Sequence, residues 1–146
     1  MRALLLTLSA VLVLAACKDA NQASATEGAG AEGESVAIPE ISVEDAAKAF
    51  EAGAVAVDAN SESTREKNGT VPDAIILTSS YKYDLAQLPD DKSKDLIFYC
   101  SSTSCTASDS AAERASANGY EKVHIMREGI KGWKAAGKPT TPYPQS

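Results

Sequence analysis

The sequence predicts an α/β domain with a central parallel sheet and helices on both of its faces. Short apolar runs with the length of strands alternate with segments of helical spacing, an order typical of a parallel sheet. The strand-like runs contain few polar residues, as expected for strands covered on both faces. About 105 residues, 38–143, are left for this domain, which is enough for a single modest core.

Each element follows from a local signal. Four apolar runs are predicted as strands of a sheet of about five: residues 54–57, 74–77, 96–99 and 122–126. Four segments are predicted as helices: residues 43–50, 81–88, 108–118 and 130–136. Ser42 is expected to cap the first helix and Gly53 to stop it, and Ser108 is expected to cap the third helix. The polar residues 61–70 are predicted as a loop.

Residues 1–16 have the pattern of a secretory signal peptide, with a positive charge at Arg2 and an almost wholly apolar or small stretch behind it. This stretch is shorter than the roughly 20 residues that a transmembrane helix needs. Its end, Leu14-Ala15-Ala16-Cys17, resembles the lipobox of bacterial lipoproteins. The resemblance implies cleavage before Cys17, lipidation of its sulfur and anchoring in the cell envelope. Lys18 favours the periplasmic face of the outer membrane if the host is Gram-negative.

Residues 17–37 are predicted to join the lipidated cysteine to the domain as a flexible tether. They are rich in Ala, Gly, Glu, Ser and Thr and contain no aromatic residue, so they cannot bury enough apolar area to order themselves. The predicted domain then occupies residues 38–146. The formal charge of the whole chain is −6, which argues against nucleic acid as a partner.

Cys100 directly follows the apolar run 96–99 and is itself followed by a small polar loop and a predicted helix. At this position of an α/β fold, loop amides and the positive end of the next helix stabilise a thiolate or a bound anion. The alternative is a buried structural cysteine that only ends the strand. Cys105 lies five positions on in the same loop and favours the functional interpretation. If Cys17 carries lipid, the other two cysteines are an even pair in a compartment that favours disulfides.

Four segments resemble the signatures of rhodanese domains, in the order of that family, and together they span residues 41–139. They are Val57-Asp58-Ala59-Asn60 with Gly69-Thr70-Val71-Pro72-Asp73-Ala74-Ile75, the run 96–99 with Cys100, Gly119-Tyr120-Glu121-Lys122-Val123, and Gly129-Ile130-Lys131-Gly132-Trp133 with Gly137-Lys138-Pro139. The resemblance implies a rhodanese-like fold in which Cys100 is the sulfur-accepting nucleophile. A subgroup of single-domain rhodaneses carries a second cysteine in the active-site loop, and this chain looks most like that subgroup.

The chain departs from the family pattern at Asn60, Thr70, Asp73 and Glu128, where the family often has Arg, His, Gly and Gly respectively. The loop 100–107 is longer than the common rhodanese loop and contains no Arg or Lys. Each missing charge-assisted hydrogen bond to an anion is worth roughly 1.5–3 kcal/mol. The loop therefore disfavours phosphatase chemistry and, more mildly, thiosulfate as a donor. Arg127 and Lys131 are the candidates for supplying a cation from outside the loop, but solvated surface positions are the favoured alternative for both.

The predicted activity is sulfur transfer, in which a Cys100 thiolate takes sulfur from a donor and stores it as a persulfide. The predicted substrate-binding residues all belong to the loop and the helix start behind it: Ser101, Ser102, Thr103, Ser104, Thr106, Ala107 and Ser108. Asp58 is expected to support that loop by hydrogen bonds, with a solvated carboxylate as the alternative. For Cys105 four roles stay open: resolving the persulfide, cycling with a redox partner, bracing the loop as a static disulfide, or remaining a free thiol.

The alternative class is a non-catalytic rhodanese-like module that binds a partner or senses redox state through the same loop. The sulfurtransferase interpretation predicts as partners a sulfur donor, either a small molecule or a protein persulfide, and a thiol acceptor or reductant. The membrane is contacted through the lipid anchor. No cofactor is predicted, and one His with two domain cysteines is too few ligands for zinc. Copper(I) on Cys100 and Cys105 is an alternative by ligand softness.

Overall fold

The structure, a computed structural model, describes residues 37–144. The predicted signal peptide, Cys17 and all but the last residue of the predicted tether lie outside the described residues. In the part of the chain that is described, no helix is long and apolar enough to cross a membrane.

Five parallel strands form one sheet in the spatial order β1-β5-β4-β2-β3. They are β1 (Glu40–Ile41), β2 (Val55–Asp58), β3 (Ile75–Ile76), β4 (Asp95–Tyr99) and β5 (Lys122–Met126). β4 is the central strand, and it pairs with β5 on one side and with β2 on the other. The predicted α/β class and the parallel sheet of about five strands are therefore confirmed.

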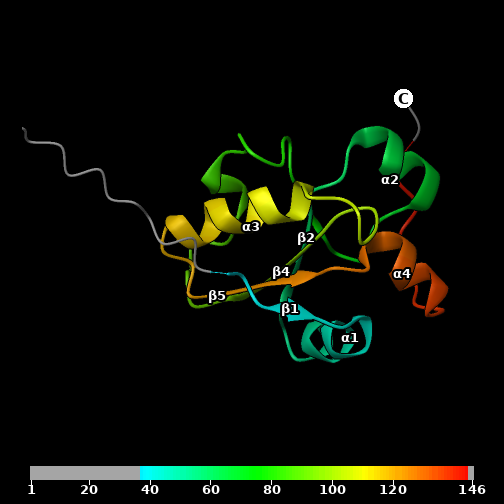
Figure 1. The fold of residues 1–146 in the computed structure, drawn as a ribbon, viewed down its shortest axis with the longest axis horizontal. Helices are drawn as coiled ribbons and strands as arrows, with labels where there is room; N and C mark the ends of the chain where they lie inside the picture. The colour runs from blue at the N-terminus through cyan, green and yellow to red at the C-terminus, as the bar shows by residue number, and fades with distance from the viewer. Residues whose placement is uncertain (1–36, 145–146) are drawn as a thin grey trace, which may run out of the picture. The chain divides into compact units, whose positions relative to one another are not determined.

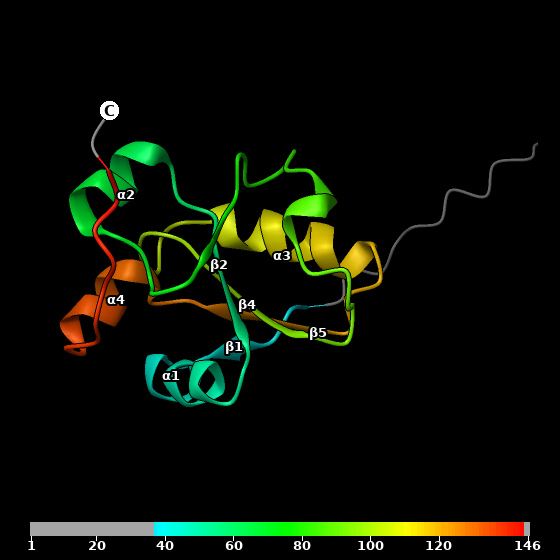
Figure 2. The same ribbon diagram turned by 180° about the vertical axis from the view of Figure 1, so that it is seen from behind.

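Helices cover both faces of this sheet. They are α1 (Val43–Glu51), α2 (Glu62–Asn68), α3 (Ala107–Ala117) and α4 (Gly129–Ala135), with a short 3-10 helix, η1 (Leu85–Gln87). α3 lies on one face of the sheet and α1 on the opposite face, whereas α2 and α4 lie toward the carboxyl ends of the strands (Figures 1 and 2). The loops that carry the candidate site are thus flanked by α2, α4 and the start of α3.

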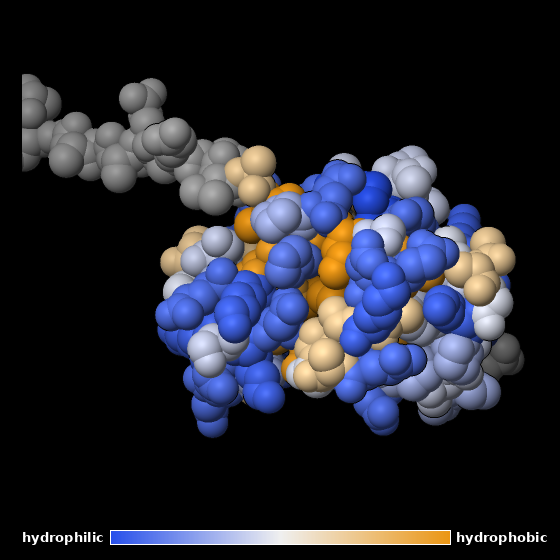
Figure 3. All heavy atoms as spheres, turned by 90° about the horizontal axis from the view of Figure 1, so that it is seen from below, coloured by the Kyte–Doolittle hydropathy of each residue, from blue (hydrophilic) through white to orange (hydrophobic). Residues whose placement is uncertain are grey.

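The core is divided by the sheet into two clusters, and the residues of β4 alternate between them. Leu96 and Phe98 belong to the cluster that includes the alanines of α3, and Ile97 and Tyr99 to the cluster on the side of α1 and α4. All four side chains are fully buried, which explains why the strand reads as an uninterrupted apolar run. Figure 3 shows the apolar residues of one face as a strip interrupted by hydrophilic ones.

Two short elements differ from the prediction because they lack a clear apolar period. Residues 61–70, predicted as a loop, contain α2, a polar helix whose buried residue is Arg65. Since the inward side chain is an arginine with polar partners, no apolar stripe marks the helix. β1 was not predicted, since it has only two residues and takes part in the sheet through its pairing with Ile125 and Met126.

Three predicted elements exist with altered bounds. The strand predicted at 74–77 is reduced to β3, a two-residue edge strand. The helix predicted at 81–88 is only the single turn η1, which Asp84 caps by accepting from the amide of Ala86. The first helix begins as predicted, because the Ser42 hydroxyl accepts from the amide of Asp45 at 3.2 Å. The cap of α3 was predicted wrongly, since the N-cap residue is Thr106 and not Ser108.

Candidate functional site

Cys100 lies at the carboxyl end of β4, the central strand, and only 1% of its surface is exposed. The chain leaves β4 toward β5, on one side of it, but leaves β2 toward β3, on the other side. Loops that diverge in this way open a crevice at the carboxyl edge of a parallel sheet, where α/β folds bind their ligands. The loops after β2 and β4 flank this point; Asp58 is the last residue of β2, and Cys100 is the first residue after β4.

Cys100 and Cys105 form a disulfide that closes the loop on itself. Their Cα atoms are 6.3 Å apart, inside the range that a disulfide spans without backbone movement. The amide of Cys105 also donates to the carbonyl of Ser102 at 3.0 Å, so a tight turn supports the bridge. The two cysteines that the sequence places in one loop are therefore bonded to each other in this structure.

The contacts of the Cys100 sulfur differ from the predicted ones. Cys100 Sγ lies 3.2 Å from the carbonyl oxygen of Cys105 and 4.0 Å from that of Ser102. Within residues 37–144, no backbone amide donates a hydrogen bond to this sulfur. The bridge and the turn behind it direct carbonyls inward, so the closed loop is not the ring of amides that a thiolate or an anion needs.

Ser108 is the donor to the Cys100 sulfur rather than the cap of the helix. It lies in the first turn of α3 and is 1% exposed, and its hydroxyl donates to Cys100 Sγ over 3.5 Å. A hydroxyl at a helix start adds a hydrogen bond to the favourable field of the helix dipole. Position and contact therefore both suit a thiolate on Cys100 once the bridge opens.

The amino end of α4 holds the backbone of the loop. The amides of Ile130 and Lys131 donate to the carbonyls of Cys100 and Ser101, at 2.8 and 3.1 Å. Gly129 makes this approach possible, since its φ is +63° and an added Cβ would lie 2.8 Å from the carbonyl carbon of Ser101. The amides that start α4 thus fix the backbone of Cys100 and Ser101.

Asp58 is fully buried and connects three parts of the site. Its Oδ1 accepts from the Asn60 amide at 2.7 Å and from Arg65 Nε at 3.1 Å, and its Oδ2 accepts from the Tyr99 hydroxyl at 2.7 Å. Arg65 also donates to the carbonyls of Asp58 and Leu77. The carboxylate therefore ties the turn after β2, helix α2 and the residue before Cys100 together. It is not a solvated carboxylate, but its hydrogen bonds reach Tyr99 and not the loop 101–108, so the expected support of that loop stays a prediction.

The hydroxyl of Tyr99 is held as a neutral donor in this network. Burial raises the pKa of Tyr99 far above its usual value, and the nearby negative charge of Asp58 raises it further. The same oxygen accepts from the amide of Val71 at 3.0 Å. Tyr99, the last residue of β4, thus ties that strand to Asp58 at the position directly before Cys100.

Asn60 stands next to this network with an unsatisfied side chain. It is 7% exposed, and neither Oδ1 nor Nδ2 has a hydrogen-bond partner among the described residues. A buried polar group without a partner destabilises a fold by about 1–3 kcal/mol. Sequence reasoning noted Asn60 only as a departure from the family pattern, and it missed Arg65 entirely because that residue lies in a segment predicted as loop.

Replacement of Asn60 by leucine, which has a similar volume, is expected to stabilise the protein in its bridged form by about 1 kcal/mol or more. The substitution removes two unsatisfied polar atoms, while the backbone amide of residue 60 keeps its bond to Asp58. Urea unfolding without reductant measures the change. Asn68→Leu is the matched control, since Asn68 Nδ2 donates to the Thr64 carbonyl and its loss should bring no gain. A clear loss of stability in Asn60→Leu would contradict the prediction.

The remaining predicted loop residues do not contact the sulfur through their side chains. Ser101, Ser102 and Ala107 are partly buried, and Thr103, Ser104 and Thr106 are exposed. The hydroxyls of Ser102 and Ser104 lie 3.4 Å from each other. These side chains form the outer surface of the bridged loop, and their role in binding substrate stays a prediction.

The two predicted outside cations have different surroundings. Arg127 forms two 2.8 Å hydrogen bonds to Asp109 on α3 and one of 2.9 Å to Glu40 on β1. These bonds lower the pKa of Asp109 and raise that of Arg127, so the guanidinium is committed to its own carboxylates. Lys131 is exposed, and its backbone already contacts Ser101. Lys131 is therefore the better placed of the two to meet an anion at the loop.

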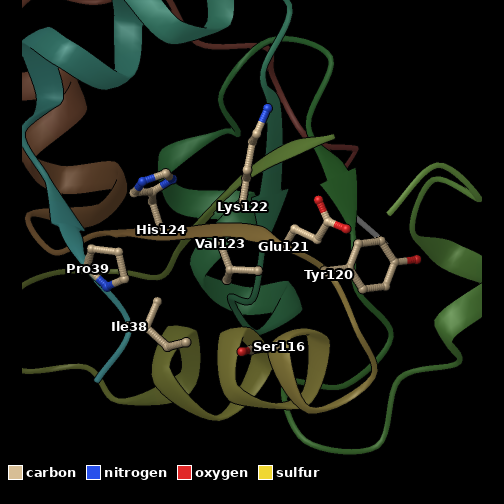
Figure 4. Close-up of a pocket in the computed structure, with 8 residues that line it drawn as sticks. All are labelled: Ile38, Pro39, Ser116, Tyr120, Glu121, Lys122, Val123 and His124. Atoms are coloured by element: carbon tan, nitrogen blue, oxygen red, sulfur yellow. The ribbon is translucent and has the colours of Figure 1, made fainter. Parts of the chain in front are cut away.

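The cavity in Figure 4 lies at the other end of β5 and does not belong to the candidate site. It has a volume of about 240 Å³ and is lined by Ile38, Pro39, Ser116, Tyr120, Glu121, Lys122, Val123 and His124. Lys122 pairs with Asp95 at the start of β4, whereas Cys100 follows the end of that strand. The Nδ1 atom of His124 is hydrogen-bonded to the Asp95 carboxylate at 2.9 Å. Among the described residues, no cluster of three metal-ligating side chains occurs.

Fold and site together define a class of protein, a parallel α/β domain with a cysteine at the carboxyl end of its central strand and a loop leading into a helix. The family described as the Rhodanese-like domain matches residues 42–136. This match covers more than half of the chain, and the chain therefore belongs to the rhodanese-like domain family. No curated protein matches the sequence.

Solved structures share the fold. The rhodanese-like domain of the Alr3790 protein from Anabaena sp. is 24% identical, with a TM-score of 0.57, over 74% of this chain and 87% of that one. The BH2092 protein from Bacillus halodurans is 21% identical, with a TM-score of 0.61, over 70% and 76%. A Rhodopseudomonas palustris protein described as a possible tyrosine phosphatase is 24% identical, with a TM-score of 0.57, over 71% and 85%. At these identities the likeness shows the fold alone.

Proposed function

We propose that this protein is a sulfurtransferase that stores sulfur as a persulfide on Cys100 and cycles this site through the Cys100–Cys105 disulfide. The observation that carries the proposal is the place of Cys100 at the carboxyl end of β4, bridged to Cys105 and accepting from Ser108 at 3.5 Å. Family membership supports sulfur chemistry of this general type. The partners are a sulfane-sulfur donor and a thiol.

The reaction begins when the bridge is reduced. The Cys100 thiolate attacks the outer sulfur of the donor, a new S–S bond forms, and the rest of the donor leaves with the electron pair of the broken bond. The Cys105 thiolate then attacks the inner sulfur of the persulfide, sulfide leaves, and the disulfide forms again. Attack of an external thiol on the outer sulfur is the other exit, and it leaves Cys100 reduced.

The polarity of the loop limits the class of donor. The described part of the loop carries only hydroxyl and small side chains, and Arg127 is committed to Asp109 and Glu40. A doubly charged phosphoryl group would lack the charge-assisted hydrogen bonds that bind it. A persulfide donor carries at most a single charge at its sulfur, so this loop suits it better than a phosphate ester.

Intact mass spectrometry tests the activity. The protein is reduced, freed of reductant and incubated with thiosulfate and, separately, with glutathione persulfide. In a Cys105→Ser background, where no internal thiol expels sulfide, we expect the mass to increase by one sulfur with the persulfide, and the increase to vanish when Cys100 is also replaced by serine. Ser110→Ala, an exposed position on α3, is the matched control and should load normally. Absence of an adduct with both donors would refute the proposal.

A non-catalytic redox or binding module is the second candidate. The observation that favours it is the inward direction of the Cys105 and Ser102 carbonyls, which leaves the bridged loop without an anion site. If the domain is such a module, no sulfur adduct should form under any condition. The Cys100–Cys105 bridge should still open and close with the ratio of thiol to disulfide in the solution. Quantitative alkylation before and after reduction measures the second property independently of any donor.

The proposal includes a lipid anchor at Cys17, which follows the lipobox-like sequence. Labelled palmitate should be incorporated into the full chain in a bacterial host, and Cys17→Ser should abolish the label. The anchor would hold the domain at an envelope membrane, on the periplasmic face of the outer membrane in a Gram-negative host. A wild-type protein that stays unlabelled and soluble would refute this part of the proposal, without bearing on the chemistry of Cys100.

A further inference from the structure

The two sulfurs of the disulfide differ in their access to solvent. Cys100 is 1% exposed, and the buried Ser108 and the Ser102 carbonyl lie against its sulfur. Cys105 is partly exposed, and both of its neighbours in the chain, Ser104 and Thr106, are exposed. The disulfide is therefore more accessible to an incoming molecule at Cys105 than at Cys100.

Thiol–disulfide exchange requires the attacking thiolate to approach one sulfur in line with the S–S bond, from the side opposite its partner. Cys100 leaves little room for such an approach, because it is 1% exposed and Ser108, which is also 1% exposed, lies against its sulfur. Cys105 is partly exposed and lies between two exposed residues. Access alone thus favours attack on Cys105.

The Ser108 hydroxyl beside the leaving sulfur favours the same direction, and it acts against the carbonyls of Cys105 and Ser102 that the closed bridge holds at 3.2 and 4.0 Å. When Cys105 is attacked, the electron pair of the broken bond moves to Cys100 Sγ, which becomes the thiolate. Ser108 already donates to that sulfur at 3.5 Å, and the start of α3 adds the positive end of its dipole. A better stabilised leaving thiolate departs faster.

We propose that Cys105 is the residue that receives the reducing thiol, and that Cys100 is always the sulfur released by this step. A thiolate, RS⁻, bonds to Cys105 Sγ, the bridge breaks, and Cys100 leaves as the thiolate. A second thiol then attacks the external sulfur of the mixed disulfide, so that RSSR departs and Cys105 is reduced. After the first step Cys100 is therefore already a free thiolate that can attack a sulfur donor. The reductant stays bonded to Cys105 until the second thiol removes it.

This inference deepens the proposed redox cycle at the same site and rests on it, but its test needs no sulfur donor. The bridged full-length protein is mixed with glutathione, quenched within seconds with acid and N-ethylmaleimide, and mapped by peptide mass spectrometry. We expect glutathione on Cys105 and the maleimide on Cys100, in excess by on the order of tenfold. Glutathione on Cys100, or on both residues equally, would overturn the proposal.

A second measurement decides the case in which no mixed disulfide survives the quench. Cys100→Ser and Cys105→Ser are each loaded with thionitrobenzoate on the remaining domain cysteine, in a Cys17→Ser background. Glutathione should release the dye from Cys105 on the order of tenfold faster than from Cys100, because the dye is the same leaving group in both. Equal release, or faster release from Cys100, would overturn the proposal.

The role of Ser108 in the departure of Cys100 is tested by rate. Ser108→Ala should slow opening of the bridge by glutathione severalfold, because the leaving thiolate loses its hydroxyl donor. Ser110→Ala on the exposed side of the same helix is the control and should leave the rate unchanged. A purely structural role of Ser108 would change thermal stability but not the rate of opening.

Discussion

Asp58→Ala is expected to destabilise the protein by about 3–5 kcal/mol, the effect of leaving a buried charge without its partner. Arg65 is 5% exposed and its Nε donates to Asp58 Oδ1, so removal of the carboxylate leaves the guanidinium enclosed with two carbonyls as acceptors. Tyr99 and the Asn60 amide lose acceptors as well. Urea unfolding followed by circular dichroism measures the change.

Two further variants show whether the lost stability comes from the unpaired buried charge of Arg65 or from the loss of any carboxylate. Asp45→Ala removes an exposed carboxylate that is paired with Lys48 on α1, and it should cause no resolvable loss. Arg65→Met, added to Asp58→Ala, should recover part of the lost stability because it removes the unpaired buried charge. If Asp58→Ala lost less than about 1 kcal/mol, the network would not hold the site together as the geometry indicates.

The fold was predictable because its central strands and longest helix each show a local pattern of apolar residues in the sequence. β2 and β4 are buried on both faces and read as apolar runs, whereas β5 has a partly exposed face, and α3 carries Ala111, Ala112 and Ala115 on its buried side. Their alternation is enough to predict a parallel sheet. The place of Cys100 follows from the same pattern, because it is the first residue after a central strand.

Other parts of the site depend on side chains that meet only in the folded chain. Arg65 and Asp58 are seven residues apart on different elements, and no period of the sequence relates them. The direction of the carbonyls around Cys100 depends on the bridge and on the turn from Ser102 to Cys105, which spacing alone does not determine. The sequence could therefore place the two cysteines together, but not the contacts that surround their sulfurs.

Cys105→Ser is expected to make sulfur loading independent of reductant. In the wild-type protein the bridge occupies Cys100, so a protein that is never reduced should take up sulfur from glutathione persulfide only with a lag, because the donor must first open the bridge. Without Cys105 the thiolate stays available and no internal thiol expels sulfide, so the persulfide should accumulate to nearly one sulfur per chain. Intact mass before and after dithiol treatment measures both states.

The same variant tells a resolving thiol from a brace. Opening a loop this short removes about 2 kcal/mol of chain-entropy stabilisation, so unfolding must be measured on the same samples. A resolving Cys105 predicts long-lived persulfide in the variant and release of sulfide by the reduced wild type. A brace predicts equal persulfide lifetimes in both proteins, with only the stability lowered. Unreduced wild-type protein that loads sulfur as fast as Cys105→Ser would show that the bridge does not control Cys100, and the proposed cycle would be wrong.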